Sequence, residues 1–127
     1  MKRWHVLLAH GSRDEEWRLP FEQLTSYTQG QLGSAVVRLA FLQLAEPTLE
    51  RVAEAAVREG ARQITVLPLF MAQGRHVTVD IETLVDEPAS RYLDVEFELR
   101  APIGSDSRLW ALLRDLVIEN ISHEASR

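Results

Sequence analysis

The stretch VLLAHGSRDEEW, from Val6 to Trp17, sets the fold class, because a buried strand ends there abruptly in a polar loop. Its first residues continue an apolar run that is typical of a strand covered on both faces. The run stops at His10, and glycine, serine, arginine and acids follow. A strand that ends in His-Gly-Ser-Arg brings a titratable, metal-capable side chain to the rim of a sheet, beside flexible backbone.

The same strand-then-helix pattern runs through the whole chain. Strands are predicted at 4–9, 35–42, 63–69 and 93–99, and helices at 19–32, 47–59, 78–87 and 107–121. Pro20 is expected to open the first helix. This alternation predicts an α/β fold, a single open parallel four-stranded sheet with helices on both faces and right-handed crossovers. We expect a flavodoxin-like winding of order 2-1-3-4, with strands one and three adjacent at the switch point.

Length and composition exclude several classes of protein. A chain of 127 residues fits one domain, which we place at 1–121, followed by a frayed tail at 122–127. The chain has no cysteine, which excludes thiolate chemistry, zinc ribbons and iron-sulfur clusters, so a metal would need histidine and carboxylate ligands. A net charge of −5 disfavours nucleic-acid binding, and no apolar run approaches the length of a membrane span. A cytoplasmic protein is expected.

Reactive side chains follow three of the four predicted strands. In open parallel sheets ligands bind beyond the carboxyl ends of the strands, so these loops are the places to inspect. His10 follows the first strand, Glu46 the second and His76 the third. Each also has a structural interpretation, because a strand-end histidine can serve as a capping group and Glu46 can be a first-turn acid before Pro47. Two histidines at one edge, each near a glycine and an arginine, favour a site.

Three separated motifs resemble a known family. LLAHGSRD at 7–14, FLQLAEPTLE at 41–50 and LPLFMAQGRHVTVDI at 67–81, followed by API at 101–103, are similar to the short class II chelatases. These are the sirohydrochlorin cobaltochelatases and ferrochelatases of the CbiX/SirB type, and the resemblance covers essentially the whole chain. It implies an ATP-independent enzyme, a lyase, that inserts a divalent metal into a tetrapyrrole in cobalamin or sirohaem biosynthesis.

The resemblance implies that His10, Glu46 and His76 are the metal ligands and the catalytic residues. Imidazole and carboxylate suit divalent cobalt, iron or nickel, and an enzyme that hands its metal on needs an incomplete coordination shell. Insertion also removes two pyrrole protons, and histidine, with a free pKa of about 6.5, can serve as the base. The metal ion is a substrate, and no organic cofactor is expected.

Substrate contacts are expected beside the two histidines. Sirohydrochlorin carries many carboxylates, so Arg13 and Arg75 must reverse the negative field of an acidic protein, unless they are ordinary solvated charges. Ser12 and Gly74 are the remaining candidate substrate-binding residues, and Gly11 and Gly74 fit turns that need positive φ or close ligand approach.

Two other functions use the same residues. A histidine phosphatase would place arginine before the reactive histidine, whereas here Ala9 precedes His10 and Arg13 follows it. A metal carrier or sensor could use the same three ligands without catalysis. Cobalt, iron and nickel all suit these ligands, so the sequence leaves the metal open.

A homodimer is expected because one such domain leaves a face of a flat macrocycle in water. The resemblance implies that longer members carry two such domains across a cleft, and a two-fold dimer would supply the second. The apolar residues near the motif loops are candidates for the dimer contact, for the macrocycle face or for ordinary core packing: Leu44, Phe70, Met71 and Ile103.

Overall fold

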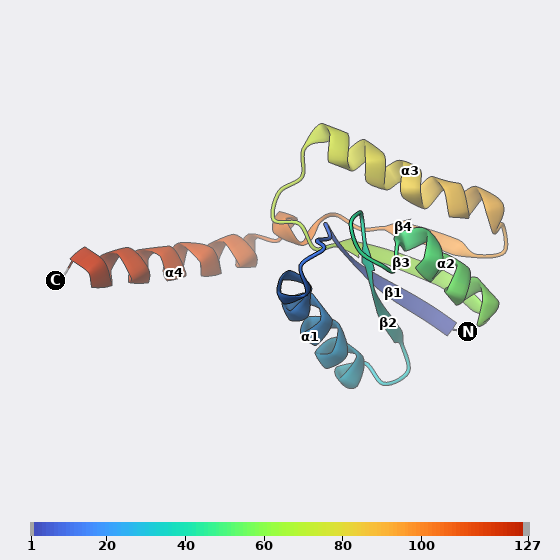
Figure 1. Ribbon diagram of the computed structural model, residues 1–127, viewed down its shortest axis with the longest axis horizontal. Coiled ribbons are helices and arrows are strands. Elements are labelled where there is room, and N and C mark those ends of the chain that lie inside the picture. The colour runs from blue at the N-terminus through green and yellow to red at the C-terminus, as the bar shows by residue number, and fades with distance from the viewer. Residues whose placement is uncertain (1, 126–127) are drawn as a thin grey trace.

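Two eight-residue strands, β1 (Lys2–Ala9) and β3 (Ala61–Pro68), form the centre of a four-stranded sheet (Figure 1). The edges are β2 (Val36–Phe41) and β4 (Glu96–Leu99). In this computed structural model, which describes residues 2–125, every pairing is parallel and the order is β2-β1-β3-β4. The predicted fold class and strand order are therefore confirmed.

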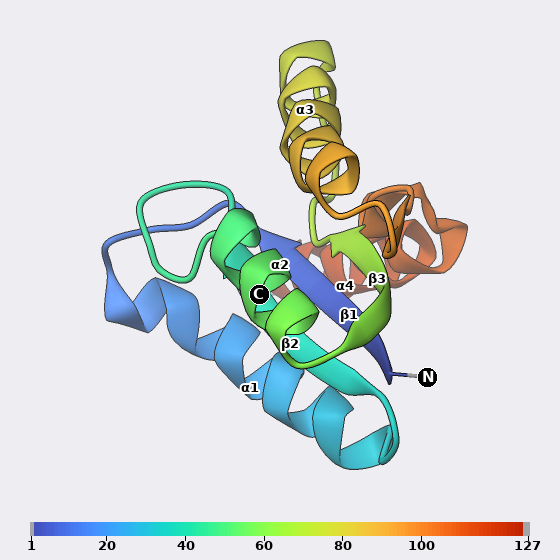
Figure 2. The same ribbon diagram turned by 90° about the vertical axis from the view of Figure 1, so that its right-hand side faces the viewer.

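The main core lies on one face of the sheet. Alternate residues of β1 and β3 point to this face and are almost fully buried against α2 (Leu49–Arg58) and α3 (Arg75–Arg91). They are Trp4, Val6, Leu8, Ile64 and Val66. Helix α1 (Glu15–Gln31) lies on the opposite face, beside β2. Figures 1 and 2 show α1 on one side of the sheet and α3 on the other, as a doubly wound fold requires.

Two helices begin earlier than the sequence predicts. Helix α1 begins at Glu15 rather than residue 19, because the Asp14 side chain accepts a hydrogen bond from the Glu16 N–H and caps it. Pro20 therefore lies inside α1 instead of opening it. Helix α3 begins at Arg75 rather than residue 78, since the Thr78 N–H already donates to the Gly74 carbonyl.

The last helix has an unexpected position. The one-turn helix η1 (Ile103–Ser105) leads into α4 (Ser107–Ala125), which projects from the body past the carboxyl edge of the sheet (Figure 1). Helix α4 runs four residues beyond its predicted end, through most of the predicted tail 122–127, whose last two residues lie outside the described residues. Trp110 packs beside η1, where its indole N–H donates to the Gly104 carbonyl, and not between helix and sheet. Within residues 2–125, no helix combines the length and apolar character that a membrane crossing needs.

Candidate functional site

Four loops meet at the carboxyl edge of the sheet, and we call this region the motif edge: residues 10–14, 42–48, 69–74 and 100–106. Backbone hydrogen bonds join neighbouring loops. The Gln43 N–H donates to the His10 carbonyl at 3.0 Å, and the Gly104 N–H donates to the Phe70 carbonyl at 2.9 Å. The loops are thus tied together in two pairs, the first with the second and the third with the fourth.

A glycine sits at each of these two junctions. Gly11 has a φ of 106°, and a Cβ there would lie 1.7 Å from the Gln43 carbonyl oxygen. A Cβ on Gly104 would lie 1.6 Å from the Met71 carbonyl oxygen. Both glycines therefore permit a close approach of two backbones that any larger residue would prevent. The expectation of a positive φ is confirmed for Gly11.

The His10 imidazole is exposed but firmly seated. Its ring stacks on Phe70 with a centroid separation of 3.9 Å and an interplanar angle of 23°. Phe70 is 1% exposed and belongs to the main core, so ordinary core packing is the correct interpretation of that residue. One face of the imidazole packs against the buried Phe70 ring, and this contact fixes the orientation of the ring edge that carries the two nitrogens.

Glu46 lies on the loop between β2 and α2, with its side chain exposed. One carboxylate oxygen accepts a hydrogen bond from the Thr48 N–H at 3.3 Å. The helix itself begins at Leu49, and Thr48 caps it by accepting from the Arg51 N–H. Helix α2 thus starts two residues later than predicted, and Glu46 and Pro47 precede the cap rather than forming its first turn.

Arg75 and His76 differ from expectation in their local structure. Both were predicted to lie in the loop after β3, but they occupy the first turn of α3. Gly74 is the N-cap residue with a φ of −74°, so of the two predicted roles a positive φ is excluded, while the open space beside its Cα leaves room for a close ligand approach. The first turn of a rigid helix holds both exposed side chains at the motif edge.

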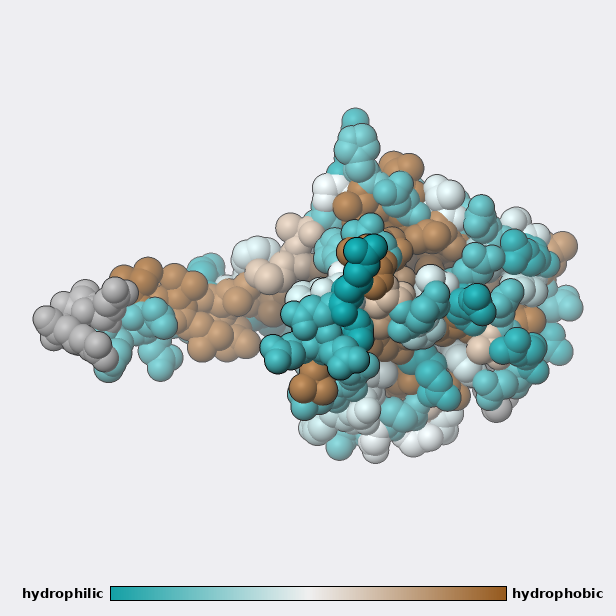
Figure 3. Space-filling view, viewed as in Figure 1, coloured by the Kyte–Doolittle hydropathy of each residue, from teal (hydrophilic) through white to brown (hydrophobic). Residues whose placement is uncertain are grey.

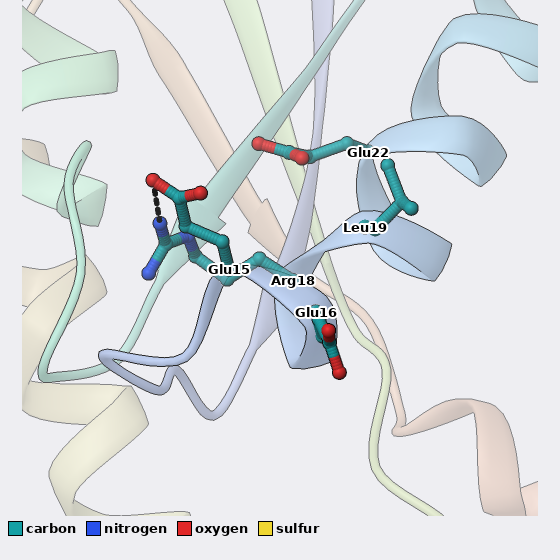
Figure 4. Close-up of a pocket in the computed structure, with 5 residues that line it drawn as sticks. All are labelled: Glu15, Glu16, Arg18, Leu19 and Glu22. Carbon is teal, nitrogen blue, oxygen red and sulfur yellow. Dashed lines mark ion pairs between the residues drawn. The ribbon is translucent and has the colours of Figure 1, made fainter.

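The first motif loop is held by a residue that sequence reasoning missed. Arg18, one turn into α1, donates to the Ser12 carbonyl at 2.8 Å and pairs with Glu15 at 3.9 Å. Figure 4 shows Glu15 and Arg18 beside a surface hollow with three further α1 residues. The Ser12 hydroxyl accepts from the Asp14 N–H at 3.0 Å, whereas Arg13 is exposed. The spacing of Glu15 and Arg18 was the available signal, because residues three apart share a helix face.

The three expected ligands reach the same edge without forming a closed cluster. Across the part of the chain that the structure describes, no three histidine, aspartate or glutamate side chains are grouped closely enough to hold a metal ion. All three are exposed, and exposed apolar side chains accompany them: Leu44, Met71 and Ile103.

Asp106, the last residue of the motif edge, has a clearly shifted pKa. The Arg108 guanidinium and the Arg108 N–H both donate to Asp106, and these bonds lower the pKa of Asp106 to about 2. Asp106 thereby caps the start of α4 as a carboxylate.

The chain is similar in sequence to a family of chelatases. The model of the CbiX family matches residues 5–120. The chain is 29% identical to the chloroplastic sirohydrochlorin ferrochelatase of Arabidopsis thaliana, over 93% of this chain and 52% of that protein. It is 30% identical to the sirohydrochlorin cobaltochelatase of Methanosarcina acetivorans, over 91% of this chain and 92% of that one. The chain thus spans about half the length of the first curated relatives, and nearly all of some others.

Solved structures have the same fold. A putative cobalamin biosynthesis CbiX protein from Marinobacter aquaeolei VT8 superposes with a TM-score of 0.81 at 35% identity, over 95% of this chain and 98% of that one. SirB from Bacillus subtilis, solved with Fe3+, superposes with a TM-score of 0.76 at 32% identity, over 86% of this chain and 43% of that one.

Proposed function

The chain belongs to the CbiX family, and we propose that it inserts a divalent metal ion into sirohydrochlorin without ATP. The observation that carries this proposal is the similarity over nearly the full length of a sirohydrochlorin cobaltochelatase about as long as this chain. Family membership also disfavours the histidine phosphatase interpretation. We also propose that the enzyme acts in the cytoplasm.

The metal substrate is held by His10, Glu46 and His76. The Phe70 stack keeps His10 in place, so His10 is the ligand around which the coordination shell forms. His76 on the first turn of α3 and Glu46 on its loop then close on the same ion. Three ligands leave coordination positions open, which lets the macrocycle nitrogens replace the protein groups one after another.

Residues of the motif edge also remove the pyrrole protons and orient the substrate in this proposal. A histidine that releases the metal becomes free to accept a pyrrole proton, so one imidazole can act in both steps. Arg13 and Arg75 are exposed and follow the two central strands, so their guanidinium groups can pair with the peripheral carboxylates of the substrate. Ser12 and the open space beside Gly74 complete the proposed contact surface.

The macrocycle is enclosed by a second copy of the chain in this proposal. The exposed side chains of Leu44, Met71 and Ile103 give the motif edge an apolar rim that fits either a flat ring or a partner. A two-fold dimer with its motif edges facing each other would form a shared cavity. Relatives about twice as long as the matched segment fit the same requirement for two units.

The test follows the absorbance of sirohydrochlorin with cobalt, iron and nickel in turn. We expect His10→Ala and His76→Ala to remove the catalysed rate, about 100-fold or more, with an unchanged circular dichroism spectrum. Glu46→Gln should reduce the rate less, because water can replace one carboxylate oxygen. Glu59→Gln, at the exposed carboxyl end of α2 on the opposite edge of the sheet, is the matched control and should keep the wild-type rate.

Each alternative result has a defined meaning. Retained activity in either histidine variant would show that the ligands are wrongly assigned. Cobalt or nickel binding by the wild-type chain, without any rate gain over free metal, would identify a carrier or sensor instead of an enzyme.

A further inference from the structure

Helix α4 exposes apolar side chains that a surface helix would normally bury. Between residues 107 and 123, no side chain of α4 is buried. Six large apolar side chains are 43% to 62% exposed: Trp110, Leu112, Leu116, Val117, Ile118 and Ile121. Trp110, Val117 and Ile121 share one side of the helix, opposite Asp115 and Glu119. Leu112 lies beside Glu119, so the apolar surface reaches most of the way around the helix. Figure 3 shows hydrophobic residues covering much of the visible surface of α4.

The sheet has a partly open hollow that is also apolar, which we call the sheet groove. On the face that carries α1, the strands β1 and β3 expose a largely apolar hollow of about 200 Å3. Its floor is formed by the partly exposed His5 and Leu67 and by Leu7 and Thr65, which are only 7% and 5% exposed. Thr28 and Leu32 of α1 form one wall. Among residues 2–125, no helix covers this face beyond β3, although a doubly wound fold normally covers both faces (Figures 1 and 2).

The connection before α4 prevents the helix from covering its own groove. Gly104 is pressed against the Met71 carbonyl and its N–H is bonded to Phe70, so η1 is fixed on the third motif loop. The Trp110 indole bonds to Gly104, and Asp106 caps the helix start, so the direction of α4 is fixed relative to η1. That direction leads past the motif edge, away from the sheet (Figure 1).

We propose that α4 packs into the sheet groove of a second copy of this chain, and that the two copies exchange these helices reciprocally. The inference rests on the dimer of the proposed function and supplies its structural basis. Because α4 leaves from the motif edge, a partner that receives it must stand beyond that edge. Two-fold exchange therefore brings the two motif edges face to face.

Size and charge support this occupant. A helix of 19 residues is about 28 Å long, which matches the roughly 26 Å of the eight-residue strands that floor the groove. Six half-exposed large side chains present on the order of 500 Å2. Counted in both copies, these helix side chains bury on the order of 1,000 Å2, which reaches the lower bound of a specific interface. Glu96 and Glu98 are exposed along the open face, and Arg114 flanks the apolar side of α4.

Single-cysteine crosslinking tests the exchange, because the natural chain has no cysteine. Leu67→Cys marks the groove, and Leu113→Cys, Val117→Cys and Ile121→Cys mark successive turns of α4. Each helix variant is mixed with a mass-tagged groove variant and oxidised. We expect a disulfide-linked heterodimer with at least one helix position. Glu119→Cys on the polar side of α4 is the matched control and should give none.

Three outcomes would overturn the proposal. The first is disulfide formation only between one α4 and another. The second is a disulfide within one chain of the Leu67→Cys/Val117→Cys double variant, without a covalent dimer. The third is the absence of any disulfide between Leu67→Cys and the three helix variants. A second measurement is independent of cysteine: Val117→Glu should halve the mass measured by light scattering, and Glu119→Lys should not. Neither crosslinking nor light scattering uses sirohydrochlorin. An inactive protein that still forms the crosslinked dimer would therefore contradict the proposed function and leave the helix exchange in place.

Discussion

At the scale of single residues, the backbone contacts of glycine organise the motif edge. Gly11 and Gly104 each let one loop touch the next at a distance that excludes a Cβ. Candidate reactive residues such as His10 are exposed, whereas the residues that hold them in position are buried or are glycines. Substitutions at these glycines should therefore change activity without removing any reactive group.

Gly11→Ala should destabilise the protein by about 2 kcal/mol or more, because the methyl group meets the Gln43 carbonyl and the backbone φ is 106°. Sirohydrochlorin metallation should fall with it, since His10 is the neighbouring residue. Urea denaturation measures the change. Gly30→Ala, inside α1 with open space around it, is the control and should stabilise by about 0.5–1 kcal/mol. Equal stability of the two variants would contradict the close approach.

The sequence predicts the position of His10 well and that of His76 less well. A long apolar strand that stops at a histidine leaves little choice of location, because strand and loop differ sharply in composition. The start of α3 has no such signal, since Gly74 provides no side-chain cap and β-branched residues follow. The stacking of His10 on Phe70 depends on residues far apart in the sequence, so only the folded structure reveals it.

At the scale of elements, the caps decide where helices begin. Asp14, Thr48 and Asp106 each accept a backbone N–H at a helix start. The sequence predicts all four strands and four helices because apolar periodicity is strong, while the boundaries depend on single hydrogen bonds. The direction of α4 was not predictable, because its amphipathic pattern shows that it needs a partner without showing which one.

The Asp106 cap of α4 is expected to depend on pH. The pKa of Asp106 is lowered from 3.8 to about 2 by its bonds to Arg108, so the folded state favours the carboxylate. The contribution of this cap is fully present above about pH 4 and is lost as the pH falls through about 2. NMR titration of the Asp106 carboxyl carbon should give a midpoint near 2. Arg108→Gln should move that midpoint toward 3.8, and an unchanged midpoint would mean that the pair is not formed in solution.

At the scale of the whole molecule, the chain has one well-covered sheet face and one partly open face. A monomer would leave both α4 and the groove in water, an arrangement that apolar surface of this extent disfavours. Folding and association are therefore expected to be coupled.

Light scattering at micromolar concentration should give twice the 14.5 kDa mass of the chain, and the melting temperature should rise with protein concentration. Both follow from mass action when the partner stabilises the folded state. A monomer that is fully active at that concentration would refute the shared cavity, while leaving the chelatase assignment in place.

The edge strand β4 has a consequence for the behaviour of the protein at high concentration. An open sheet edge can recruit strands from other molecules and seed fibrils. Strand β4 is only four residues long, and its sequence EFEL alternates a negative charge with each apolar side chain. A second β4 aligned beside it would bring Glu96 and Glu98 close to the same charges of its neighbour. The sheet therefore resists edge-to-edge aggregation, while the proposed dimer associates through a helix.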